Sequence, residues 1–91
     1  MSGGHFDHRE YGMLFIAEDI QKAVDDNSSD EMDAWGHPVS MDYPLKVIEK
    51  FRMTKEMLET VHKMVHRIDY LLSGDDGPDS FLRRWNEEGL P

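Results

Sequence analysis

The sequence predicts an all-α protein of three helices, with a long central helix as its spine. Apolar residues recur at intervals of three and four in three separate segments. Glycine, proline and aspartate cluster between those segments, and no segment shows the alternation typical of a strand. Ninety-one residues are enough for one domain and too few for two, so we expect residues 1–91 to form a single helical domain.

The first helix is expected over residues 7–27. Its apolar positions fall on one face at helical spacing: Met13, Ile16, Ala17, Ile20 and Val24. Asp7 is suited to cap the start, and Glu10 three residues later would complete a pair resembling a capping box. Residues 28–42 then read as an acidic loop, because Gly36 and Pro38 interrupt any helical period. Trp35 within this loop is expected to fold back onto the core.

Residues 44–72 give the strongest helical signal. Pro44 suits a first helical turn, and Asp42 is the expected N-cap. Spacings of four and three alternate along a seam that resembles a heptad repeat: Val47, Phe51, Thr54, Leu58, Val61, Val65, Ile68 and Leu72. At about 1.5 Å per residue this helix is over 40 Å long, so the first helix cannot cover it all. We therefore expect a homo-oligomer, specifically a dimer, formed through residues 47–72.

A third, short helix is expected over residues 78–88. Gly74 suits the left-handed position that follows a helix, and Pro78 suits the first position of the next one. Phe81, Leu82 and Trp85 lie on one side of this helix.

The net charge of −9 is unevenly distributed. Residues 25–42 carry −6 without a basic side chain, residues 43–68 carry +3, and residues 69–91 carry −4. Because an acidic chain repels phosphate backbones, direct nucleic-acid binding is not expected. The absence of cysteine excludes disulfides and thiolate zinc sites. With no membrane-length apolar run and no apolar signal core, we expect a cytoplasmic protein without membrane contact.

Catalytic and metal-binding patterns are weak. His62 and His66 have the spacing of a two-point metal ligand, with Asp69 three residues further on. Position 63 is lysine, so the HExxH pattern is absent, and a solvated helix face is the favoured interpretation. The acidic loops do not fit the calcium-hand pattern. No nucleophile elbow or phosphate-binding loop occurs. We expect no metal, no cofactor and no enzymatic activity.

Two segments stand out, Gly3-Gly4-His5-Phe6-Asp7 and residues 67–77. The start SGGHFDHREY and the stretch RIDYLLSGDDGPDSF resemble a group of small bacterial and tailed-phage proteins without an assigned activity. Those proteins open with SGGHFDYxxY and close with RIDW-LSGDDGxESF. This chain departs from that pattern at His8, commonly aromatic, and at Tyr70, commonly tryptophan. The resemblance implies a small, soluble, often phage-borne accessory protein, which would then act in the host cytoplasm.

The glycines before His5 allow close approach to another surface. We expect the N-terminal segment to fold back against the end of the long helix, with Phe6 buried and Asp7 near Arg67. One interpretation is that both motifs only cap helices and form turns. The other is a composite binding site for a ligand or partner, composed of His5, Phe6, Asp7, Arg67, Asp69, Asp75, Asp76, Arg83 and Arg84.

The first functional hypothesis is a non-enzymatic accessory protein that binds and modulates a host protein, in counter-defence or host takeover. Small size, an acidic surface, the lack of catalytic motifs and the resemblance all favour it.

An alternative is a sponge for a small nucleotide-like signal. Arginines would hold phosphate and aromatic rings would stack on the base. The candidates are Arg67, Arg83, Arg84, Phe6, Tyr70 and Trp85, although nearby aspartates would repel phosphate.

A further alternative is a mimic of a polyanion such as DNA. Its densest run of acids is Asp25, Asp26, Asp30, Glu31, Asp33 and Asp42. Because a loop does not fix the spacing of these charges, we expect their conversion to amides to leave partner binding largely intact.

Overall fold

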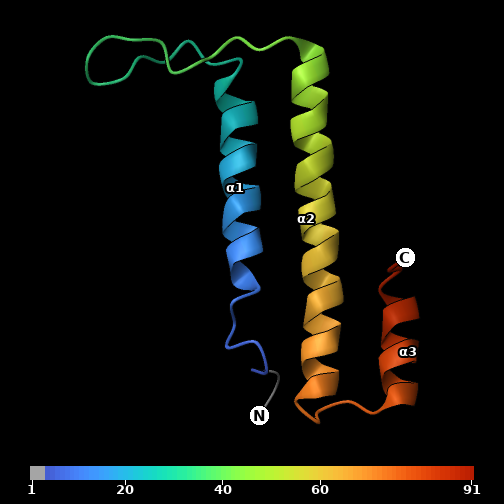
Figure 1. Ribbon diagram of the computed structural model, residues 1–91. Coiled ribbons are helices and arrows are strands. Elements are labelled where there is room, and N and C mark those ends of the chain that lie inside the picture. Colours follow the sequence, from blue (N-terminus) through green and yellow to red (C-terminus); the bar gives the residue numbers. More distant parts are fainter. Residues whose placement is uncertain (1–3) are drawn as a thin grey trace.

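Three helices run side by side in the computed structural model, which describes residues 4–91 (Figure 1). They are α1 (Tyr11–Asp26), α2 (Leu45–Leu72) and α3 (Pro78–Glu87). Among the described residues no strand forms, and the one isolated bridge joins Met32 to Pro38. The predicted all-α class with a long central helix is therefore confirmed. Gly3 of the first motif lies outside the described residues.

Helix α1 begins four residues later than expected. Asp7 and His8 both have left-handed backbones, with φ of 55° and 59°, which a right-handed helix does not allow. The N-cap position falls on Glu10, whose side chain makes no capping hydrogen bond. The predicted pairing of Asp7 with Glu10 across the helix start is therefore wrong. Residues 5–10 instead form tight turns that carry the N-terminus toward α2.

Helix α2 begins at Leu45, with Pro44 in the N-cap position. The prediction that Asp42 caps this helix is wrong, because Asp42 adopts a left-handed φ of 52° two residues earlier. At the other end, Gly74 has the expected left-handed φ of 81°, and Pro78 is the first residue of α3. Helix α3 then runs back beside the C-terminal half of α2 (Figure 1).

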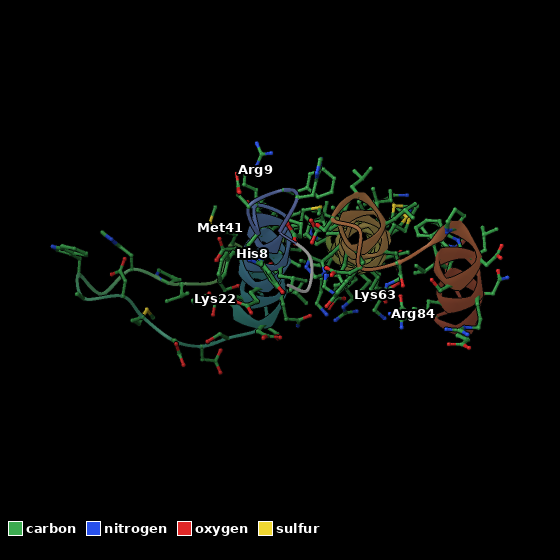
Figure 2. The ribbon with its side chains drawn as sticks, turned by 90° about the horizontal axis from the view of Figure 1, so that it is seen from below. His8, Arg9, Lys22, Met41, Lys63 and Arg84 are labelled. Atoms are coloured by element: carbon green, nitrogen blue, oxygen red, sulfur yellow. The ribbon has the colours of Figure 1, made fainter. Side chains whose placement is uncertain are left out.

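The three helices form one flat layer, with overall extents of 54 × 26 × 13 Å. Seen from below, the loop, α1, α2 and α3 lie in a row (Figure 2). The only apolar residues buried among those described are Ala17, Val24 and Ile48. The predicted seam on α2 is divided: Phe51, Leu58 and Val65 are half-buried, whereas Val47, Val61, Ile68 and Leu72 are exposed. A single layer therefore leaves much of the apolar surface of α2 uncovered.

Within residues 4–91, none of the helices combines the length and apolar character needed to cross a membrane.

Candidate functional site

The N-terminal segment folds back onto the C-terminal end of α2, where its backbone contacts Asp69. The Asp69 carboxylate accepts hydrogen bonds from the backbone N–H groups of Gly4, at 2.8 Å, and Phe6, at 3.2 Å. The N–H of His5 donates to the Ser73 hydroxyl at 3.1 Å. Asp69 is 1% exposed, making it the most buried side chain among the described residues. We call this contact of residues 4–6 with Asp69 and Ser73 the N-terminal clasp.

The clasp keeps Asp69 charged despite its burial. Burial alone raises the pKa of the Asp69 carboxyl. Hydrogen bonds from the backbone N–H groups of Gly4 and Phe6 oppose that effect, with smaller contributions from the nearby His5 N–H and from His66, and the pKa of Asp69 falls below its ordinary value. The carboxylate is thus held in its ionised form by backbone donors rather than by a cation.

The expected fold-back occurs, but its partner differs from the prediction. Asp7 is exposed and makes no ion pair with Arg67, and Phe6 is only half-buried. The reason is helical geometry: residues two apart on a helix point in nearly opposite directions. Asp69 therefore contacts the segment that precedes α1, whereas Arg67 contacts the α3 side of α2.

Arg67 is the centre of a second polar cluster. Its side chain is 8% exposed and lies 3.7 Å from the Asp76 carboxylate and 3.6 Å from that of Glu88. The guanidinium also lies over the Tyr70 ring, 4.8 Å from its centroid. Arg84 reaches the other oxygen of Asp76 at 3.5 Å. These pairs join α2, the turn that follows it and α3.

Asp76 shapes the turn itself. Its side chain is buried, and one of its carboxylate oxygens accepts a hydrogen bond from the Ser80 hydroxyl at 3.2 Å. The backbone N–H groups of Asp75 and Asp76 both donate to the carbonyl oxygen of Tyr70, in the last turn of α2. These two hydrogen bonds terminate the helix. The Asp76 carboxylate in the GDDG turn thus holds α3 in place.

The nine residues of the predicted composite site are therefore not brought together. Phe6 and Asp69 belong to the clasp, while Arg67, Asp76 and Arg84 form the cluster on the other side of α2. The remaining four side chains are exposed: His5, Asp7, Asp75 and Arg83. Of these, Arg83 pairs with Glu87 on the same helix at 3.8 Å. Of the nine, Phe6 alone lines the neighbouring cavity, whose other walls are Arg9, Glu10, Met13 and Val65. The geometry matches the simpler interpretation, in which the motifs cap helices and form turns.

His62 and His66 are half-buried, so the predicted solvated helix face is wrong. Their rings stack 6.2 Å apart and continue a row of aromatic contacts, with Tyr11 5.4 Å from His62 and Tyr70 4.6 Å from His66. Burial lowers the pKa of His62, His66 lowers it further, and Glu10 partly opposes both. In the described part of the chain, no three His, Cys, Asp or Glu residues are grouped so as to hold a metal ion.

The loop between α1 and α2 is a more distinctive feature than the motif residues. Asn27 closes its base: the Asn27 amide donates to the Tyr43 carbonyl at 3.1 Å and accepts from the Tyr43 N–H at 2.7 Å. The Ser40 hydroxyl also donates to the carbonyl of Asn27, at 2.7 Å. Residues 28–42 therefore leave the helices as a closed loop with a fixed neck (Figure 1).

The tip of this loop is a tight turn around Asp33. The Asp33 carboxylate accepts hydrogen bonds from the N–H groups of Trp35, at 2.8 Å, and His37, at 2.9 Å. The Asp33 N–H donates to the His37 carbonyl at 2.8 Å, and Gly36 has the left-handed φ of 77° that the turn requires. Backbone hydrogen bonds and one carboxylate thus define the position from which Trp35 projects.

Trp35 does not fold back onto the core, so that prediction is wrong. Its side chain is 81% exposed, and the loop that carries it extends away from all three helices (Figure 1). Met32 and Met41 in the same loop are also exposed. The sequence signal for this surface was the acidic run of residues 25–42, which has no basic side chain. That charge opposes collapse of the loop onto other acidic parts of the chain.

Comparisons with protein-family models, with curated proteins and with solved structures found no match to this chain.

Proposed function

We propose that this protein is a non-enzymatic binding protein whose Trp35 loop inserts into an apolar pocket of a partner protein. The observation that carries the proposal is an 81% exposed tryptophan at the tip of a hydrogen-bonded loop. Tryptophan is among the residues that most often dominate binding free energy, because burying its large ring removes much apolar surface from water. Trp35 has the exposure and the support that such an anchor needs.

Order in the loop strengthens the proposal. A mobile loop loses conformational entropy on binding, at about 0.5–1.5 kcal/mol per immobilised side chain. Here the Asn27 neck and the Asp33 turn already fix the backbone on both sides of Trp35. Much of the backbone entropy of the loop is therefore lost during folding rather than during association.

The charge of the loop indicates the chemistry of the partner. Asp30, Glu31 and Asp33 surround the tip, and residues 25–42 contain no lysine or arginine. A pocket with a basic rim would be attracted to this loop, mainly through faster association at low salt. The resemblance of the terminal motifs to bacterial and phage proteins supports a bacterial host protein as the partner, bound and modulated by a phage-borne accessory protein. Polyanion mimicry is then a contribution to association rate rather than the basis of recognition.

The nucleotide-sponge alternative has less support. Two of its three arginines, Arg67 and Arg84, are paired with Asp76. Trp85 packs on Phe81 at 5.4 Å, and its indole N–H donates to the Pro91 carbonyl at 2.8 Å. These groups would have to leave their partners before they could hold a nucleotide.

Affinity capture from a bacterial lysate tests the proposal. The wild-type chain and three variants are immobilised: Trp35→Ala, Phe15→Ala as another exposed aromatic, on α1, and a variant with the six acids of residues 25–42 changed to amides. We expect one protein to be retained by the wild type and Phe15→Ala, lost by Trp35→Ala, and largely retained by the amide variant at moderate salt. Equal capture of that protein by Trp35→Ala would contradict the proposal.

A further inference from the structure

The face of α2 that contacts α3 is covered along only half of its length. Helix α3 lies beside the C-terminal half of α2 only, and nothing faces the N-terminal half on that side (Figure 1). An open groove of about 520 Å³ lies along the middle of α2, lined by Met53, Glu56, Met57, Thr60, Val61, Met64 and Pro91.

The exposed area of the molecule is too large for a compact monomer. Its accessible surface is 6681 Å², whereas a compact chain of 10.6 kDa exposes about 5,500 Å². Its radius of gyration is 17.8 Å, against about 12 Å for a compact chain of this length. The loop of residues 28–42 accounts for part of the excess, and the open half of α2 for another part. The total excess is about 1,200 Å², of the same order as the roughly 800 Å² that each partner buries in a standard interface.

Charges identify what fits the open half of α2. Lys46 and Lys50 continue the stripe of Met53 and Met57 at helical spacing. Neither lysine has an ion-pair partner among the described residues. The outer side of α3 presents Leu82, which is 59% exposed, with Asp79 one turn earlier and likewise without a partner in the described chain. An apolar side chain with an adjacent acid thus matches the stripe of Met53 and Met57 and the two lysines that continue it.

We propose that two copies of this chain form an antiparallel dimer in which α3 of each copy covers the open N-terminal half of the other copy's α2. A two-fold axis near Met57 relates the two copies, so their α2 helices run in opposite directions. The two α3 helices then lie end to end between the two α2 helices, each beside the N-terminal half of the other copy's α2. Leu82 of the second copy then lies near Lys50, and its Asp79 lies near Lys46. This arrangement replaces the α2–α2 seam expected from the heptad spacing.

The lengths of the helices agree with this arrangement. Helix α2 has 28 residues and α3 has 10, which correspond to about 42 Å and about 15 Å at 1.5 Å per residue. Two α3 helices placed end to end cover about 30 Å of α2, leaving about 12 Å for residues 88–91 of the two copies. The two α3 helices and the two segments of residues 88–91 together therefore have the length needed to fill the space between the α2 helices.

The proposal is independent of the Trp35 loop, which stays exposed in the dimer. Light scattering at tens of micromolar should give twice the chain mass of 10.6 kDa. Leu82→Glu should raise the dimer dissociation constant by roughly 30-fold or more, with circular dichroism unchanged because Leu82 is already exposed in the single chain. Phe15→Glu, on the outer face of α1, is the matched control and should remain dimeric.

Because the chain has no cysteine, introduced thiols test the pairing directly. Lys50→Cys and Leu82→Cys chains, mixed in a glutathione redox buffer, should form a mixed disulfide well above the level of a Phe15→Cys and Leu82→Cys mixture. Met57→Cys should not link to itself, because α3 separates the two α2 helices. A monomeric wild type overturns the proposal, as does a Met57–Met57 link in place of the 50–82 link.

Discussion

Replacing Asp69 with asparagine should lower the free energy of unfolding by about 2 kcal/mol at pH 7. The carboxylate is 1% exposed and accepts two backbone N–H groups, at 2.8 and 3.2 Å. Hydrogen bonds to a charged group contribute about 1.5–3 kcal/mol each. In the asparagine variant one oxygen can still accept a hydrogen bond, but the second carboxylate oxygen is replaced by an NH₂ group. Because this group is a donor and faces another N–H, about one hydrogen bond is lost. Detachment and hydration of the N-terminal segment limit the cost.

Urea denaturation followed by circular dichroism measures this change. A chain of this length has a total stability of roughly 5–14 kcal/mol, so the variant should still fold, with a midpoint lower by about 1 M urea. The control is the same substitution in a chain that lacks residues 1–7. Without the clasp, Asp69→Asn should cost less than about 0.5 kcal/mol. An equal cost in both backgrounds would refute the role of Asp69 in holding the N-terminus.

The pH dependence has a defined sign. The pKa of Asp69 is lowered in the folded chain, so the clasp contributes fully above the unfolded value of about 3.9. Its contribution is lost as the pH falls through the lower folded pKa. The stability difference between wild type and Asp69→Asn should therefore be constant from pH 7 to about 5 and shrink below about 4.

Three further predictions follow from burial and pairing. Arg67→Ala should lower the free energy of unfolding by about 3 kcal/mol in urea denaturation, because the buried Asp76 carboxylate loses a charged partner. Trp35→Ala should change it by less than about 0.5 kcal/mol, since the side chain is almost fully exposed. The lowered pKa of His62 means that its contribution to stability is present above about pH 6.5 and is lost as the pH falls through the folded value. His62→Gln should accordingly flatten the decline in thermal midpoint between pH 7 and 5.

Periodicity was sufficient to predict the helices because each one turns a single apolar face toward a neighbouring helix, although only α1 and α2 bury residues fully. In α2, seam residues such as Phe51 and Val65 are half-buried and line cavities shared with residues of α1. The helical spacing of apolar residues predicts such a half-buried face. The same spacing does not say which neighbour covers each residue. The exposed members Val61 and Leu72 obey the same period as the half-buried ones. The period therefore predicted the length of α2 but not its partner.

Local backbone conformation explains the errors at the helix starts. Asp7 and His8 are compatible with a helix by sequence, but in the fold they adopt a left-handed φ within the turns that connect the clasp to α1. Gly4 and Phe6 must present their N–H groups to Asp69, and a helix beginning at residue 7 would direct the chain elsewhere. The long-range clasp thus determines where α1 begins.

The separation of the composite-site residues follows from the sequence. Arg67 and Asp69 are two residues apart on a strongly periodic helix, so their side chains lie on opposite sides of it. The exposure of Trp35, in contrast, follows from hydrogen bonds of Asp33 and Asn27 that composition does not reveal. A tryptophan in a loop generally finds apolar cover, and this loop has too few apolar neighbours to provide it.

The proposed function requires that a partner contacts the Trp35 loop while the motif residues maintain the fold. Photo-crosslinking tests it most directly, with a photoreactive phenylalanine analogue placed at position 35 in one chain and at position 83, on α3, in another. The protein retained by the wild-type chain should crosslink to position 35 and not to position 83. A crosslink at position 83 without one at position 35 would show that the partner binds the C-terminal cluster, contradicting the account.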